Sequence, residues 1–133
     1  QYNVGQNMSY SMFLDRQAFV YCYYQDVRGQ VTQVYPNPLQ RAQPMRGNAA
    51  TQVPDTSNAQ SFAIEFDTPG QEELACFATD QEIITKLPPT MRGPALQPLM
   101  GVTNLGQMQK AFETALSGAK YALVRKQWVI AKK

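Results

Sequence analysis

The sequence predicts an α+β fold that is mostly antiparallel β, as a sandwich-like sheet, with one C-terminal amphipathic helix and a final strand. Short aromatic and β-branched runs separated by turn residues are typical of hairpins. A charged content of 17% and nine prolines favour a loop-rich, β-leaning protein. Near the C-terminus, apolar residues recur every three to four positions, as in a helix. The 133 residues suit a single domain over 1–133. Within it we expect a β core over 2–79, a proline-rich connection over 80–102, and the helix and last strand over 103–133.

The first strands are predicted from alternation and composition. Met8 to Leu14 alternates weakly, as a half-buried strand does. Ala18 to Tyr24 (AFVYCYY) is rich in aromatic residues and is the strongest strand prediction, its aromatic side chains forming core. Asp26 to Gly29 supplies turn residues, so Gln30 to Tyr35 is expected to return as the second strand of a hairpin.

A second hairpin is expected further along the chain. Leu39 to Gln60 is polar and predicts a long surface excursion, with a short strand around Thr51 to Val53. Ser61 to Asp67 then alternates, and Glu73 to Thr79 follows a Thr-Pro-Gly turn. We expect these two runs to pair with each other.

The helix is predicted over Leu105 to Leu116, where the apolar spacing is helical. Thr103 or Asn104 is available as its N-cap, and Gly118 marks its end. This helix is expected to cover one face or edge of the sheet.

Tyr121 to Ile130 is expected to close the chain as a strand with one buried face. Ala122, Val124, Trp128 and Ile130 share one parity, so we expect Trp128 to pack beside its two apolar neighbours against the helix.

The composition excludes several kinds of catalytic site. The chain contains no histidine, which excludes Ser-His-Asp triads, Cys-His pairs and His-bearing zinc sites. Two cysteines cannot build a four-thiolate zinc site. The net charge of +2 is too small to indicate nucleic-acid binding. A carboxylate-only site, a lone reactive cysteine, or binding without catalysis remain.

Cys22 and Cys76 each fall in the middle of a strand, in different predicted hairpins. A reactive thiol needs a cationic or helix-N-terminal neighbour, and no Lys or Arg lies within three residues of either cysteine. A buried pair of thiols and a disulfide both remain open. A disulfide requires Cα atoms within about 7 Å and an oxidising compartment.

Carboxylates concentrate between Asp55 and Glu82, where seven occur with no Lys or Arg among them. Glu65 and Asp67 are expected together on the solvent face of a strand. They could act as a glycosidase-like acid pair or bind calcium. Acids on a solvated strand are ordinary, however, and the chain lacks an Asp-x-Asp-x-Asp-Gly loop. The solvated-face interpretation is therefore favoured.

The C-terminal part is basic, with six cations and one acid, Glu113, over residues 103–133. Arg125 and Lys126 are candidates for contact with an anionic partner. The alternative, which we favour, is a solvated helix face with an edge strand that lysines protect from aggregation.

The order of several short motifs resembles a known bacterial family. The aromatic strand AFVYCYY, the turn DVRGQV, the VYPN corner at Tyr35 to Asn37 and the run FAIEFDTPGQEELACFAT are similar to the family named domain of unknown function 4384. The resemblance covers Tyr2 to about Thr79. It implies a β-rich interaction or structural module, appended to bacterial peptidases, kinases or envelope lipoproteins and without an established activity of its own.

We therefore expect a non-catalytic interaction or structural domain of a bacterial cell-envelope protein, such as a component of a secretion or surface assembly. It is expected in the periplasm or associated with the outer membrane, with protein partners, no nucleic acid, no cofactor and no metal. Membrane contact is expected only through a lipid anchor of the parent or another subunit. Candidate contact residues are Tyr35, Asn37, Arg125 and Lys126. The alternatives are a carboxylate-dependent cell-wall glycan hydrolase and an anion-binding module.

Overall fold

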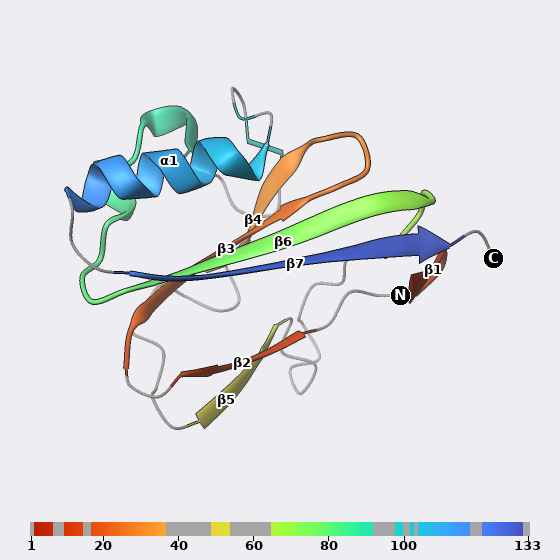
Figure 1. Cartoon of the computed structure of the whole chain (residues 1–133), viewed down its shortest axis with the longest axis horizontal. Coiled ribbons are helices and arrows are strands. Elements are labelled where there is room, and N and C mark those ends of the chain that lie inside the picture. The colour runs from red at the N-terminus through yellow and green to blue at the C-terminus, as the bar shows by residue number, and fades with distance from the viewer. Residues whose placement is uncertain are drawn as a thin grey trace.

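The structure is a computed structural model of the chain, and it describes residues 2–6, 10–14, 17–36, 49–53, 65–91, 98–99, 102, 104–117 and 121–131. The elements form three layers (Figure 1). Helix α1 (Leu105–Leu116) covers one face of a five-stranded sheet, and a two-stranded ribbon lies beside the opposite face, called here the outer face. The predicted α+β class is confirmed.

The main sheet has the strand order β1-β7-β6-β3-β4. Strands β3 (Phe19–Gln25), β4 (Val31–Tyr35), β6 (Gly70–Thr79) and β7 (Ala122–Ala131) pair antiparallel. Strand β1 (Tyr2–Asn3), which the sequence did not indicate, pairs parallel with the end of β7. The sheet is therefore mixed, and the last strand of the chain lies between the first strand and β6.

The ribbon consists of β2 (Tyr10–Leu14) and β5 (Ala49–Val53), paired antiparallel with Tyr10 opposite Val53. Both strands were predicted, with slightly different bounds. They pair with each other and not with the main sheet.

The turn between β3 and β4 is built by one aspartate and one glycine. Asp26 Oδ1 accepts hydrogen bonds from the N–H groups of Arg28 and Gln30, both at 2.9 Å. Gly29 adopts φ +85°, which favours glycine. The predicted hairpin is confirmed.

The second predicted hairpin is wrong. Strand β6 pairs with β3 on one side and with β7 on the other, so no edge remains for Ser61 to Asp67. Of that segment only residues 65–67 are described. Phe66 bonds instead to the N-terminal residues: its N–H donates to the Gln6 carbonyl at 2.9 Å, and its carbonyl accepts from the Gly5 N–H at 2.8 Å. Alternation shows which residues share a face, but not which strand receives their backbone hydrogen bonds.

The predicted bounds of the helix are confirmed. Asn104 is the N-cap, its Oδ1 accepting the Gln107 N–H at 3.0 Å. The helix ends at Ser117, which adopts a left-handed conformation with φ 51°. The expected terminator, Gly118, lies outside the described residues.

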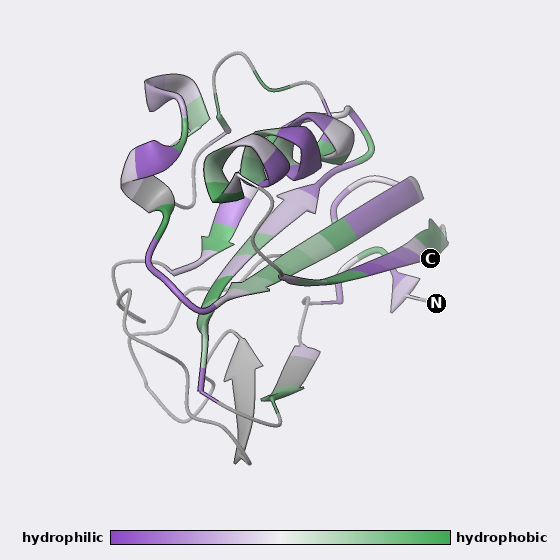
Figure 2. Cartoon of the chain, turned by 60° about the vertical axis from the view of Figure 1, so that its left-hand side comes forward, coloured by the Kyte–Doolittle hydropathy of each residue, from purple (hydrophilic) through white to green (hydrophobic). Residues whose placement is uncertain are grey.

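Each face of the sheet has its own core. The core under α1 contains Tyr21, Tyr23, Val31, Ala75, Phe77, Ile83, Leu87, Leu99, Val102, Leu105, Met108 and Phe112. The outer core contains Val20, Cys22, Tyr24, Val34, Tyr35, Phe66, Leu74 and Ile130. Because neighbouring residues of a strand point to opposite faces, the aromatic run of β3 supplies both cores. Its predicted role as core is confirmed. Figure 2 shows hydrophobic residues along the middle of the sheet, between α1 and the ribbon.

Trp128 packs on the outer face and not against the helix, so that part of the prediction is wrong. Its ring centroid lies 5.8 Å from that of Tyr2, 6.4 Å from that of Tyr24 and 6.2 Å from that of Phe66. Val124 is on the same face but is 58% exposed. Trp128, Val124 and Ile130 do share one face of β7, as predicted. Their spacing, however, does not indicate which face of the sheet the helix covers.

The proline-rich connection forms two short 3₁₀ helices, Ile84–Lys86 and Pro89–Met91. Ile83 and Leu87 beside them are buried in the core under α1. Among the described residues, no helix is long and apolar enough to cross a membrane.

Candidate functional site

Cys22 and Cys76 lie directly opposite each other on β3 and β6 and form a disulfide, with their Cα atoms 4.1 Å apart. They point to the outer face, where Cys22 is fully buried. Because both cysteines of the chain are in this bond, neither is a free thiol. Of the two structural interpretations that the sequence left open, the structure has the disulfide.

Glu65 and Asp67 are both exposed, and Phe66 between them is buried. Asp67 Oδ1 accepts a hydrogen bond from the Thr68 hydroxyl at 3.0 Å. Within the described part of the chain, no three carboxylate or thiol groups come together as a metal site would require.

The structure draws attention to a different carboxylate, Glu72, which is only 5% exposed on the outer face. Burial raises the pKa of its carboxyl above the ordinary value of 4.5, hydrogen bonds from Tyr24 and Trp128 lower it, and the charges of Asp26 and Asp67 raise it. Trp128 Nε1 donates to Glu72 Oε1 at 3.3 Å. The carboxyl group therefore anchors two aromatic side chains.

Sequence reasoning missed Glu72 because an acid in an acidic run suggests solvent. Glu72 nevertheless shares the parity of Leu74 and Cys76 in β6, and this signal could have placed it on an apolar face.

Tyr35 and Asn37 were candidates for partner contact. Tyr35 belongs to the outer core, opposite Cys22, and is 7% exposed. Asn37 lies outside the described residues. The position of Tyr35 is that of a core residue.

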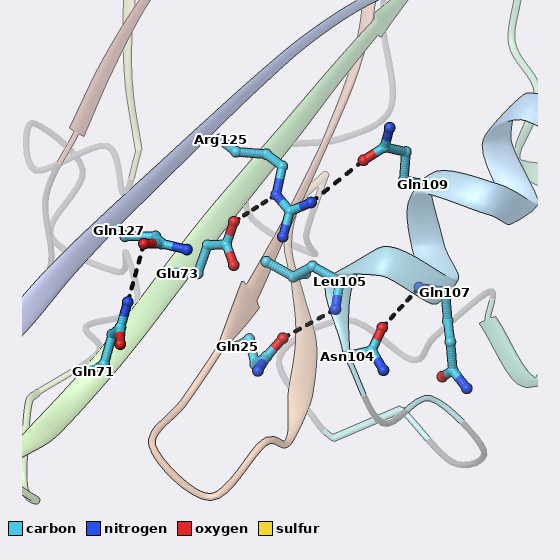
Figure 3. A network of polar contacts seen from close by, with 9 residues as sticks. All are labelled: Gln25, Gln71, Glu73, Asn104, Leu105, Gln107, Gln109, Arg125 and Gln127. Carbon is cyan, nitrogen blue, oxygen red and sulfur yellow. Dashed lines mark hydrogen bonds and ion pairs between the residues drawn. The ribbon is translucent and has the colours of Figure 1, made fainter.

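Arg125 joins three elements of the fold (Figure 3). Its Nε donates to Glu73 Oε2 on β6, and its Nη1 donates to Gln109 Oε1 on α1 at 3.4 Å. The bond to Glu73 raises the pKa of the Arg125 guanidinium. Next to it Gln71 Nε2 donates to Gln127 Oε1 at 3.0 Å, so this polar network ties β7 to its neighbours.

Lys126 points to the opposite face of the sheet from Arg125, because consecutive residues of a strand alternate between faces. It lies at the wall of a groove on the outer face. The two candidate basic residues therefore do not form one patch: Arg125 is on the helix side, and Lys126 is on the groove side.

The groove is a hollow of about 510 Å³ between the ribbon and the outer face of β6 and β7. Its wall is mostly apolar and includes Tyr10, Phe13, Val20, Cys76, Val124 and Lys126. Phe13 is 66% exposed and Val124 is 58% exposed. The groove could hold apolar side chains of a ligand, with one ammonium group at its border.

The comparisons with known proteins agree with the motif order. No curated protein and no solved structure shows significant similarity to the chain. The family model described as "Domain of unknown function (DUF4384)" matches residues 1–82. This span contains β1 to β6 and excludes α1 and β7. Since it is more than half of the chain, the protein belongs to the family of domain of unknown function 4384.

Proposed function

We propose that this chain is a non-catalytic protein-interaction domain of a bacterial cell-envelope protein, and that the groove on the outer face is its contact surface. The observation that carries the proposal is the exposure of Phe13 and Val124 at an apolar groove. Large apolar side chains gathered at one hollow of a surface commonly mark a site of interaction.

The disulfide supports an envelope location. A bond between Cys22 and Cys76 forms and persists in oxidising compartments such as the periplasm, and is rare in the cytosol. Contact with a membrane would come through a lipid anchor of the parent protein or through another subunit.

The positions of the carboxylates favour binding over hydrolysis. A glycosidase needs one carboxyl group to protonate the leaving group and a second across the scissile bond. Glu72 is buried and bonded to Trp128, whereas Glu65 and Asp67 are exposed.

Position-specific crosslinking tests the contact surface. A photoreactive phenylalanine analogue is placed at Phe13 in living cells, and the matched control carries it at Thr114, an exposed residue of α1. We expect a discrete crosslinked protein from position 13 and none from position 114. The adduct should disappear in a Val124→Asp variant. Equal adducts from both positions would count against the groove.

An activity measurement addresses the hydrolase alternative. The purified chain is expected to release no soluble fragments from peptidoglycan. Release by the wild type that is lost in a folded Glu65→Gln, Asp67→Asn double variant would replace the proposal with the enzyme.

A further inference from the structure

Strand β7 is much longer than the strand on its outer side. Strand β6 pairs with β7 from Ala122 to Ile130, whereas β1 reaches only Ile130 and Ala131. As far as the described residues go, the stretch from Ala122 to Val129 has no strand on this side. Figure 1 shows β7 along the margin of the sheet, with β1 only at its C-terminal end.

The backbone groups that face this margin can be named. The Val4 N–H donates to the Ala131 carbonyl at 3.0 Å, so Ala131 points its carbonyl toward β1. Alternate residues of a strand direct N–H and C=O to the same side. Leu123, Arg125 and Gln127 therefore offer both groups to the free edge, and Val129, whose carbonyl faces Tyr2 in the parallel register with β1, offers its N–H, while the even-numbered residues bond to β6.

Apart from the charged side chains of Arg125 and Lys126, this edge lacks the devices that normally prevent strand addition. Ala122–Ala131 contains no proline or glycine, and its register with β6 runs without a bulge. Val124 and Val129, on opposite faces, are 58% and 54% exposed. An added strand would cover both side chains.

The charge of the edge determines the kind of partner. Ala122–Ala131 carries no carboxylate and two cations: Arg125, whose Nε is paired with Glu73 on β6, and Lys126 on the groove side. Two copies paired antiparallel about the middle of β7 would bring these cations close together, and like charges directly opposite each other destabilise a pair of strands. A strand with carboxylates at these positions would be complementary.

We propose that an extended acidic segment of another protein adds to the free edge of β7 as a further antiparallel strand. This inference rests on the proposed interaction function and specifies its binding mode. The backbone of the segment pairs with Leu123 to Val129. Its carboxylates lie opposite Arg125 and Lys126, and an apolar side chain opposite Val124 extends into the groove. Backbone hydrogen bonds provide affinity in this mode, and the alternating side chains provide specificity.

The probe is a labelled synthetic peptide of about seven residues, designed for this register. It carries valines opposite Leu123, Val124 and Val129, glutamates opposite the two cations, and threonines elsewhere. One control peptide replaces the glutamates with lysines. A second is N-methylated at the residues that would donate to β7, which removes hydrogen bonds and leaves the side chains unchanged. We expect binding of the acidic peptide only, measured by fluorescence anisotropy on the whole chain.

Two variants at Gln127 test the edge itself. Gln127→Pro removes an N–H that faces outward, so no bond to β6 is lost, and it should weaken binding about tenfold. Gln127→Thr removes the same side chain but keeps the N–H, and it should bind like the wild type. If the proline variant does not fold, the N-methylated peptide tests the same bonds.

Charge reversal tests the partner chemistry. Lys126→Glu should bind the lysine peptide better than the acidic peptide, which reverses the preference of the wild type. An unchanged preference would overturn the acidic character of the partner.

Amide hydrogen exchange followed by NMR gives the most specific result. In the free protein the N–H groups of Leu123, Arg125, Gln127 and Val129 should exchange faster than those of Val124, Lys126 and Trp128, and the peptide should protect the fast set. If these four N–H groups were already protected from exchange in the free protein, and lost that protection when the protein was diluted, a second copy of the chain would occupy the edge. That result would overturn the proposal.

The two proposals can fail separately. Binding of the N-methylated peptide as tightly as its parent would overturn strand addition while leaving the groove as a contact surface. If Phe13 gave no crosslink but the peptide still protected the odd-numbered N–H groups of β7, the groove would not be the contact surface. Strand addition at the edge of β7 would still stand.

Discussion

Gly70 occupies a position that other residues fit poorly. It begins β6 at φ +144°, and a Cβ at this residue would lie 2.7 Å from Val27 Cγ1. Val27, in the turn that begins at Asp26, therefore lies close to the start of β6. A side chain here would strain the backbone and displace Val27.

We expect Gly70→Ala to lower the free energy of unfolding by about 2 kcal/mol, measured by urea denaturation. Gly5→Ala is the matched control, because Gly5 also has a positive φ of 97° but would meet nothing within 4 Å. Adding Val27→Ala to the Gly70→Ala variant should recover part of the loss. Equal losses in the two single variants would mean that the contact with Val27 is unimportant.

The burial of Glu72 leads us to expect that the stability of the fold depends on pH. Its pKa is raised in the folded chain above the ordinary 4.5, so the folded state holds this proton more tightly than the unfolded state does. By linkage, the contribution of Glu72 to stability falls as the pH rises from about 4.5 through the folded pKa. It stays constant above that pH.

Glu72→Gln removes this titration and keeps an acceptor for Trp128. The difference in unfolding free energy between variant and wild type should therefore shift in favour of the variant as the pH rises from about 4 to about 8. Urea denaturation at a series of pH values measures it. A difference that does not change with pH would contradict the prediction.

At the scale of the element, α1 is held at its N-terminus by two side chains from different parts of the chain. Asn104 accepts the N–H of Gln107, and Gln25 Oε1 on β3 accepts the N–H of Leu105 at 3.0 Å (Figure 3). The first N–H groups of a helix have no partner within it. Here one is satisfied by a local cap, and another by the sheet on which the helix packs.

Asn104→Ala should lower the free energy of unfolding by about 1 kcal/mol, measured by urea denaturation. Asn104→Asp retains an accepting oxygen and should cost much less. The same cost for both variants would show that the Asn104 side chain does not cap α1.

Strand β7 is the element that completes the sheet. The family model ends at residue 82, yet β7 lies between β1 and β6 and pairs with both. Trp128 on β7 also contacts Tyr2, Tyr24 and Phe66. The C-terminal segment is thus part of the same sheet as the matched region.

At the scale of the whole molecule, the disulfide closes a long loop. Cys22 and Cys76 are 54 residues apart in the chain. In the chain-entropy model, a bond over such a loop stabilises the folded state by about 4 kcal/mol.

Replacing both residues (Cys22→Ala with Cys76→Ala) should therefore lower the free energy of unfolding by about 4 kcal/mol. A reductant should destabilise the wild type and leave the double variant unchanged. Intact mass after alkylation of freshly purified, unreduced, denatured protein checks the bond directly. Two alkylated thiols there would contradict it, and would remove the main support for a periplasmic location.

The sequence by itself determined the local features: the Asp26 turn, the bounds of α1, the positions of most strands and the sharing of faces within them. These follow from the residues involved, because backbone preference and side-chain periodicity act over a few neighbours. Only the tertiary structure decided that β6 pairs with β3 and β7, that Trp128 faces away from α1, and that Glu72 is buried. It also decided that, among the described residues, most of β7 has no strand on its outer side, beside an apolar groove. Each of these depends on contacts between segments far apart in the chain, and periodicity within one strand carries no information about the strand that will lie beside it.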